Sequence, residues 1–143
     1  MDDALTASSV GLGPLGVTSM HDATEGGVIG GLAEMAYASR KAVVIERAKV
    51  NITPDCRAVC DAFGIDPLTT VSEGSLLLTC DATRAHELQA KLGRRGIPAH
   101  QIGSVKKGRG LWASGEAGAP RRVAPARDRY WAAYERAVRS HLK

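Results

Sequence analysis

The segment that most constrains this chain is a glycine-rich run, HDATEGGVIGG, at positions 21–31. Asp22 followed three residues later by Glu25 is the pattern of a capping box, which predicts that a helix begins here. The first two turns of that helix would contain Gly26, Gly27, Gly30 and Gly31. Each glycine in a helix interior costs about 1 kcal/mol relative to alanine, or about 4 kcal/mol in total. The glycines must therefore have a role that offsets this loss.

Two interpretations of the glycines remain open. In the functional one, N–H groups at the helix N-terminus bind a phosphate or another anion, helped by the helix dipole. In the structural one, bare glycine faces let the helix pack closely against a sheet. The run matches neither a P-loop nor a dinucleotide-binding fingerprint. Asp22 and Glu25 would repel a bare phosphate, so they fit better if Mg²⁺ bridges them to the phosphates or if the ligand carries an amine.

Short apolar runs alternate with amphipathic stretches along the rest of the chain. We expect strands at 17–20, 42–45, 75–80, 97–105 and 110–113, the last two joined by a basic turn, KKGRG. We expect helices at 28–39, between Thr53 and Gly64, at 82–92 and at 127–141. Residues 1–15 read as a flexible lead-in and 115–126 as a loop, which leaves 16–143 as one domain. This alternation indicates a layered α/β or α+β fold.

The charge of the chain is unevenly distributed. Residues 94–143 carry 12 Lys/Arg and 3 acidic residues, a net charge of +9, and residues 1–93 carry −5. A binding module for nucleic acid or an acidic partner is therefore an alternative function. It is the less favoured one, because a stacking platform is missing: the helical spacing of Tyr130, Trp131 and Tyr134 predicts that they pack.

Composition also bears on the location of the chain. No apolar run approaches the ~20 residues that span a membrane, and MDDALTASS lacks the basic start of a secretory signal. The three cysteines form no CxxC pair, so a reduced, cytoplasmic chain is expected. Cys56 and Cys60 share a face of the expected helix, and a metal or redox centre there would need Cys80 or another ligand nearby; buried thiols are the simpler explanation.

Four segments, in order, resemble the C-terminal half of the aminoimidazole ribonucleotide synthetase superfamily. They are MHDATEGGVIGGLAEMA (20–36), RAVCDAFGIDPL (57–68), SEGSLLL (72–78) and IGSV (102–105). The resemblance runs over residues 16–105 and, within the superfamily, is strongest to hydrogenase expression/formation proteins and related proteins of unknown reaction. It implies an α+β fold, a three-layer α/β/α sandwich with a mixed sheet that is partly ferredoxin-like.

The resemblance also implies a function and a set of site residues. Members are two-domain enzymes that use Mg·ATP and dimerise through an N-terminal domain, which holds most of the ATP ligands and has no counterpart here. The C-terminal domain forms one wall of the cleft, so this chain alone should be inactive. The implied ligand-binding residues are Asp22, Thr24, Glu25, Gly26, Gly27, Ser72 and Gly74. His21 and Glu73 are candidate catalytic residues, and Asp22 and Glu25 are the candidate Mg²⁺ ligands.

Overall fold

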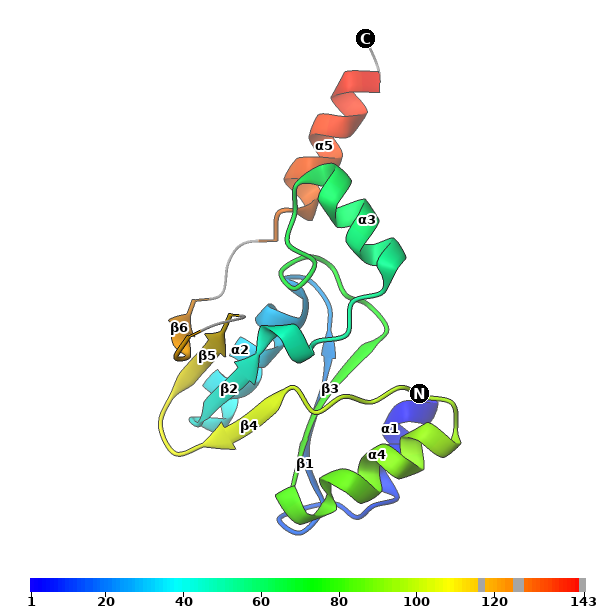
Figure 1. Ribbon diagram of the computed structural model, residues 1–143, viewed down its shortest axis with the longest axis vertical. Helices are drawn as coiled ribbons and strands as arrows, with labels where there is room; N and C mark the ends of the chain where they lie inside the picture. Colours follow the sequence, from blue (N-terminus) through cyan, green and yellow to red (C-terminus); the bar gives the residue numbers. More distant parts are fainter. Residues whose placement is uncertain (116–117, 125–127, 142–143) are drawn as a thin grey trace.

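The structure, a computed structural model, describes residues 1–115, 118–124 and 128–141 (Figure 1). Its helices are α1 (Asp2–Ser8), α2 (Gly27–Ser39), α3 (Pro54–Phe63), α4 (Ala85–Arg94) and α5 (Tyr130–His141), with short 3-10 turns η1 (Arg47–Lys49) and η2 (Ala82–Arg84). Its strands are β1 (Val17–Ala23), β2 (Ala42–Glu46), β3 (Ser75–Cys80), β4 (Gly103–Lys106), β5 (Gly110–Ser114) and β6 (Arg121–Val123). No described helix is both long and apolar enough to cross a membrane.

The strands form two separate units. β1 and β3 pair antiparallel as a two-stranded ribbon, and the other strands form a sheet in the order β4-β2-β5-β6. Within that sheet β2 is parallel to β5 and antiparallel to β4. The expected mixed sheet is thus confirmed, but β4 and β5 do not form a hairpin, because β2 lies between them.

Helix α2 lies between the ribbon and the mixed sheet. Its Ile29 packs in one core cluster with Ala23 and Leu77 of the ribbon and with Ile45 and Leu111 of the sheet. A second cluster joins α1 and α4 to the opposite face of the ribbon. Helices therefore cover both faces of the ribbon (Figure 1), and the expected α+β fold with α/β/α layering is confirmed.

The first 15 residues are not a flexible lead-in. Residues 2–8 form α1, and Ala7 and Val10 are buried against Leu88 and Leu92. The segment begins with polar residues and continues with glycine and proline, so its sequence shows no clear helical periodicity. The short helix is stabilised instead by packing against α4. The expected loop at 115–126 likewise contains β6, whose Val123 pairs with Leu111 of β5.

The start of α2 also differs from the capping-box prediction. β1 continues to Ala23, and Asp22 lies opposite Leu76 in the ladder with β3. Asp22, the expected N-cap residue, is therefore part of a strand and does not cap the helix. α2 begins at Gly27, after Gly26, and no side chain caps it. By contrast, α3 follows its expected signals: Thr53 Oγ1 accepts a hydrogen bond from the Cys56 N–H, and Gly64 ends the helix in the left-handed conformation.

Candidate functional site

Two turns at one end of the ribbon bring the motifs of the sequence together. Residues 22–27 leave β1 and residues 72–74 enter β3; we call them the paired turns. The Ser72 N–H donates to the Thr24 carbonyl oxygen at 3.2 Å, and the Gly27 N–H donates to the same oxygen at 3.1 Å. The two motifs that the resemblance assigned to one cleft are therefore adjacent in space.

The paired turns present oxygen ligands to solvent. Asp22, Thr24, Glu25 and Glu73 are all exposed, and the side chains of Asp22 and Glu25 form no hydrogen bond or ion pair within the described residues. Carboxylates suit Mg²⁺, which commonly takes one or two of them and completes its shell with phosphate oxygens and water. No group of three or more His, Cys, Asp or Glu among the described residues could hold a metal. The donor set thus fits a metal shared with a phosphate and does not form a cage of its own.

His21 is directed toward α2. Its Nε2 lies 2.7 Å from Oε2 of Glu34, an ion pair when the ring is protonated. A Cβ added at Gly31 would lie 3.2 Å from the His21 Cδ2 and 2.7 Å from the Leu77 Cδ1. The absence of a side chain at Gly31 therefore lets α2 pack against the ribbon, which is the structural interpretation of this glycine.

Gly27 is also required by packing. Its φ is +64°, and a Cβ there would overlap the Thr70 carbonyl oxygen and lie 2.8 Å from that of Leu68. The Leu68 carbonyl in turn accepts the Ile29 N–H at 2.9 Å. Backbone groups of the chain itself thus bind part of the N-terminus of α2.

The Gly26 N–H, in contrast, binds an anionic oxygen. It donates to Oδ2 of Asp128 at 2.9 Å, while Oδ1 of Asp128 accepts the Tyr130 N–H at 2.8 Å at the start of α5. The carboxylate of Asp128 therefore accepts hydrogen bonds at the N-termini of both α2 and α5. Asp128 and Gly26 are 102 positions apart in sequence. Sequence reasoning missed Asp128, because the helix expected at 127–141 placed it inside the helix, whereas α5 begins at Tyr130 and Asp128 accepts the Tyr130 N–H.

The three cysteines do not gather. Cys56 is exposed, Cys60 is buried and Cys80 packs in the cluster between the ribbon, α1 and α4. Burial, together with the neighbouring Cys56, raises the pKa of the Cys60 thiol to about 11, and burial also raises the pKa of Cys80. The two shifted thiols stay protonated near neutral pH, as expected of core residues.

The aromatic residues of α5 pack on one another and lie outside the two core clusters. The ring centroids of Tyr130 and Trp131 are 5.2 Å apart, and those of Tyr130 and Tyr134 are 6.1 Å apart. Their exposed fractions are 37%, 53% and 52% in chain order. The three rings thus pack, as expected, but on one another. They remain accessible to solvent on a helix that extends away from the sheets (Figure 1).

Comparison with known proteins places the fold and the motifs in one family. The family model "AIR synthase related protein, C-terminal domain" matches residues 10–113. Carbamoyl dehydratase HypE of Cupriavidus necator is 35% identical over 94 residues, which are 63% of this chain and 26% of that protein. Among solved structures, HypE of E. coli, a hydrogenase maturation protein, superposes with a TM-score of 0.76 at 27% identity, covering 88% of this chain and 39% of that one.

A structure of the hydrogenase maturation protein HypE in complex with ATP also matches, with a TM-score of 0.70 and 26% identity over 78% of this chain and 36% of that one. The chain thus spans between a quarter and two fifths of the length of these relatives. The matched family model covers more than two thirds of the chain and includes both paired turns. This chain therefore belongs to the AIR synthase related family, and it corresponds to the C-terminal domain of that family.

Proposed function

We propose that this domain supplies one wall of a phosphate- and substrate-binding cleft in an ATP-dependent protein similar to the hydrogenase maturation proteins. The observation that carries the proposal is the contact between the paired turns, in which the Ser72 N–H binds the Thr24 carbonyl. That contact gathers exposed carboxylate and hydroxyl groups at one end of the ribbon. The other wall, with most of the ATP ligands and the surface for homodimerisation, belongs to an N-terminal domain or an equivalent subunit.

Each group of the paired turns has a role in this proposal. Asp22 and Glu25 would hold the Mg²⁺ ion of Mg·ATP, since carboxylate oxygens are among its preferred ligands. The Thr24 hydroxyl and the Gly26 N–H bind phosphate oxygens, with Ser72 and Gly74 shaping the adjacent turn. Gly26 is suited to this because its N–H already donates to an anionic oxygen, that of Asp128. Gly27 contributes by letting the turn approach Thr70.

Bound Mg·ATP would supply the activated phosphoryl group, and this chain would contribute positioning and proton transfer. Glu73 is exposed on the second of the paired turns and is one candidate for proton transfer. His21 is the second candidate, and its bond to Glu34 would orient the ring.

A chimera tests this proposal. In E. coli HypE, the segment that this chain matches is replaced by residues 10–141, and ATP hydrolysis is measured after cooperative unfolding has shown that the chimera folds. Asp22→Asn together with Glu25→Gln should abolish most of the hydrolysis. Asp55→Asn together with Asp61→Asn on α3 is the matched control and should leave it unchanged. A folded chimera whose hydrolysis responds equally to both pairs would refute the assignment.

A second candidate function, a binding module for nucleic acid, gains support from α5. Exposed Tyr130, Trp131 and Tyr134 provide aromatic faces near Arg129 and Arg136, and stacking on aromatic rings is how single strands are bound without sequence preference. The test is the salt dependence of binding to a single-stranded oligonucleotide, since each neutralised phosphate adds about 0.7 to the log–log slope. A slope near zero would eliminate this candidate.

A further inference from the structure

A cavity between α1 and α4 is lined by cations and lies away from the paired turns. It has a volume of about 280 Å³ and is lined by Leu5, Thr6, Ser9, Lys91, Arg94 and Arg95. Three of these side chains are basic and none is acidic. This volume is at the lower limit of small-molecule sites, which measure roughly 300–1,000 Å³, so the cavity suits a small ligand.

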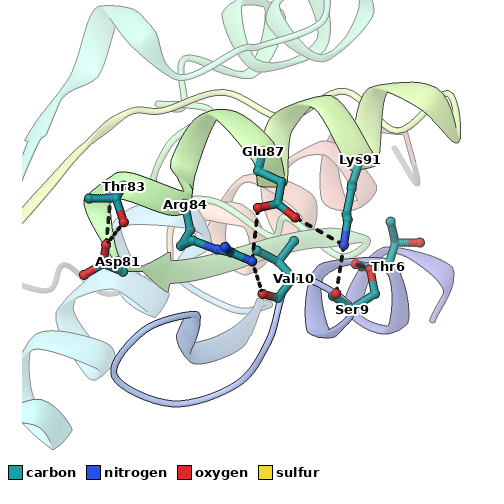
Figure 2. A network of polar contacts seen from close by, with 8 residues as sticks. All are labelled: Thr6, Ser9, Val10, Asp81, Thr83, Arg84, Glu87 and Lys91. Atoms are coloured by element: carbon teal, nitrogen blue, oxygen red, sulfur yellow. Dashed lines mark hydrogen bonds and ion pairs between the residues drawn. The ribbon is translucent and has the colours of Figure 1, made fainter.

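Structural needs account for only some of the cations in this region. Figure 2 shows Lys91 bound to the carbonyl oxygen of Ser9 and Arg84 bound to that of Val10, at 2.8 Å each. Both also bind the carboxylate of Glu87, at 3.4 and 3.0 Å. These contacts satisfy the carbonyl groups that follow α1 and use the one acidic residue of α4.

The other two basic residues that line the cavity, Arg94 and Arg95, make no such contacts with the described residues. Arg94 and Arg95 are exposed, and neither forms an ion pair with any described residue. The acidic residues of α1, Asp2 and Asp3, are in its first turn, and Asp3 binds the N-terminal amine at 3.2 Å. The cavity therefore carries uncompensated positive charge.

A hydroxyl group also borders the site. Thr6 lines the cavity and is 8% exposed, and Figure 2 shows no hydrogen bond between its hydroxyl and the other residues drawn. Because Thr6 borders the cavity, an acceptor oxygen placed there would bind this hydroxyl.

We propose that this cavity binds the phosphate group of a small phosphorylated molecule. A phosphate offers several acceptor oxygens, which a guanidinium binds in bidentate fashion and which can also accept the Thr6 hydroxyl. Leu5, 63% exposed at the edge of the cavity, would contact an apolar part of the ligand. The site is independent of the paired turns and of their proposed function.

The test is a titration of the full chain with inorganic phosphate and with phenyl phosphate at fixed ionic strength, followed by NMR of the backbone amides. Saturable shifts are expected at Thr6, Ser9 and Arg95, with phenyl phosphate binding more tightly because of Leu5. Arg94→Gln with Arg95→Gln should weaken binding at least about tenfold. Arg121→Gln with Arg122→Gln on β6 removes the same charge elsewhere and should have little effect.

Thr6 is tested with a pair of variants. Thr6→Val keeps the shape of the side chain, removes the hydroxyl and should weaken binding several-fold without loss of stability, whereas Thr6→Ser should retain affinity. The proposal fails if binding does not saturate, or if the two arginine double variants weaken it equally. It also fails if Thr6→Val, shown to be folded by its cooperative unfolding, binds as tightly as the natural chain.

Discussion

Gly27→Ala measures how tightly α2 approaches the loop that precedes β3. Gly27 has a φ of +64°, which costs an L-residue about 1–2 kcal/mol. A Cβ there would overlap the Thr70 carbonyl oxygen and lie 2.8 Å from that of Leu68. Leu68 is 4% exposed, so relief requires part of the core to move, at a cost of about 1–3 kcal/mol. The two costs together predict that the free energy of unfolding falls by about 2–5 kcal/mol.

Gly64→Ala is the matched control for this measurement. Gly64 has a φ of +63°, and a Cβ there meets nothing within 4 Å, so only the conformational cost of about 1–2 kcal/mol remains. Both variants are compared with the natural chain by urea unfolding followed by circular dichroism. If the two variants lose the same free energy, the close approach at Gly27 does not constrain the fold and the reasoning is refuted.

Four further predictions address α4, α3, the turn at Gly26 and the core. Gly93→Ala should raise the free energy of unfolding by about 0.5–1 kcal/mol, because Gly93 is helical and a Cβ there meets nothing within 4 Å; a loss in urea unfolding would contradict this. Thr53→Ala should cost about 1 kcal/mol by removing the cap of α3, measured in the same way and disproved by an unchanged midpoint. Asp128→Asn should increase the affinity of the chimera for Mg·ATP, since an uncharged amide competes less well with phosphate for the Gly26 N–H; calorimetry showing unchanged or weaker binding would argue against that role. Because the folded chain keeps the Cys60 proton up to a pKa of about 11 and the unfolded chain loses it near 9, stability should fall as pH rises from about 9 to about 11, and Cys60→Ala should reduce that slope in unfolding measured at several pH values.

The sequence predicted those elements whose signals are local. The cap at Thr53 and the left-handed end at Gly64 define α3 without help from the rest of the chain. The helix expected at 28–39 is confirmed, but its capping box at Asp22 was wrong, because Asp22 pairs instead with Leu76, 54 positions later. α1 was missed because its apolar residues are buried by α4 and the ribbon, which are distant in sequence.

Only part of the candidate site could be predicted from the sequence. That the paired turns belong together came from the resemblance, since no spacing in one sequence brings Ser72 to Thr24. The carboxylate of Asp128 on Gly26 joins residues 102 positions apart, so no local pattern could have revealed it. The glycines themselves were ambiguous in the sequence, and the structure assigns Gly27 and Gly31 to packing.

The most direct test of the central claim is amide hydrogen exchange of the chimera with and without Mg·ATP. If the paired turns face the nucleotide cleft, peptides covering residues 22–27 and 72–74 should exchange more slowly when Mg·ATP is bound. Peptides from α3 and α4 should not change. Protection that leaves both paired turns unaffected while the chimera binds Mg·ATP would contradict the account.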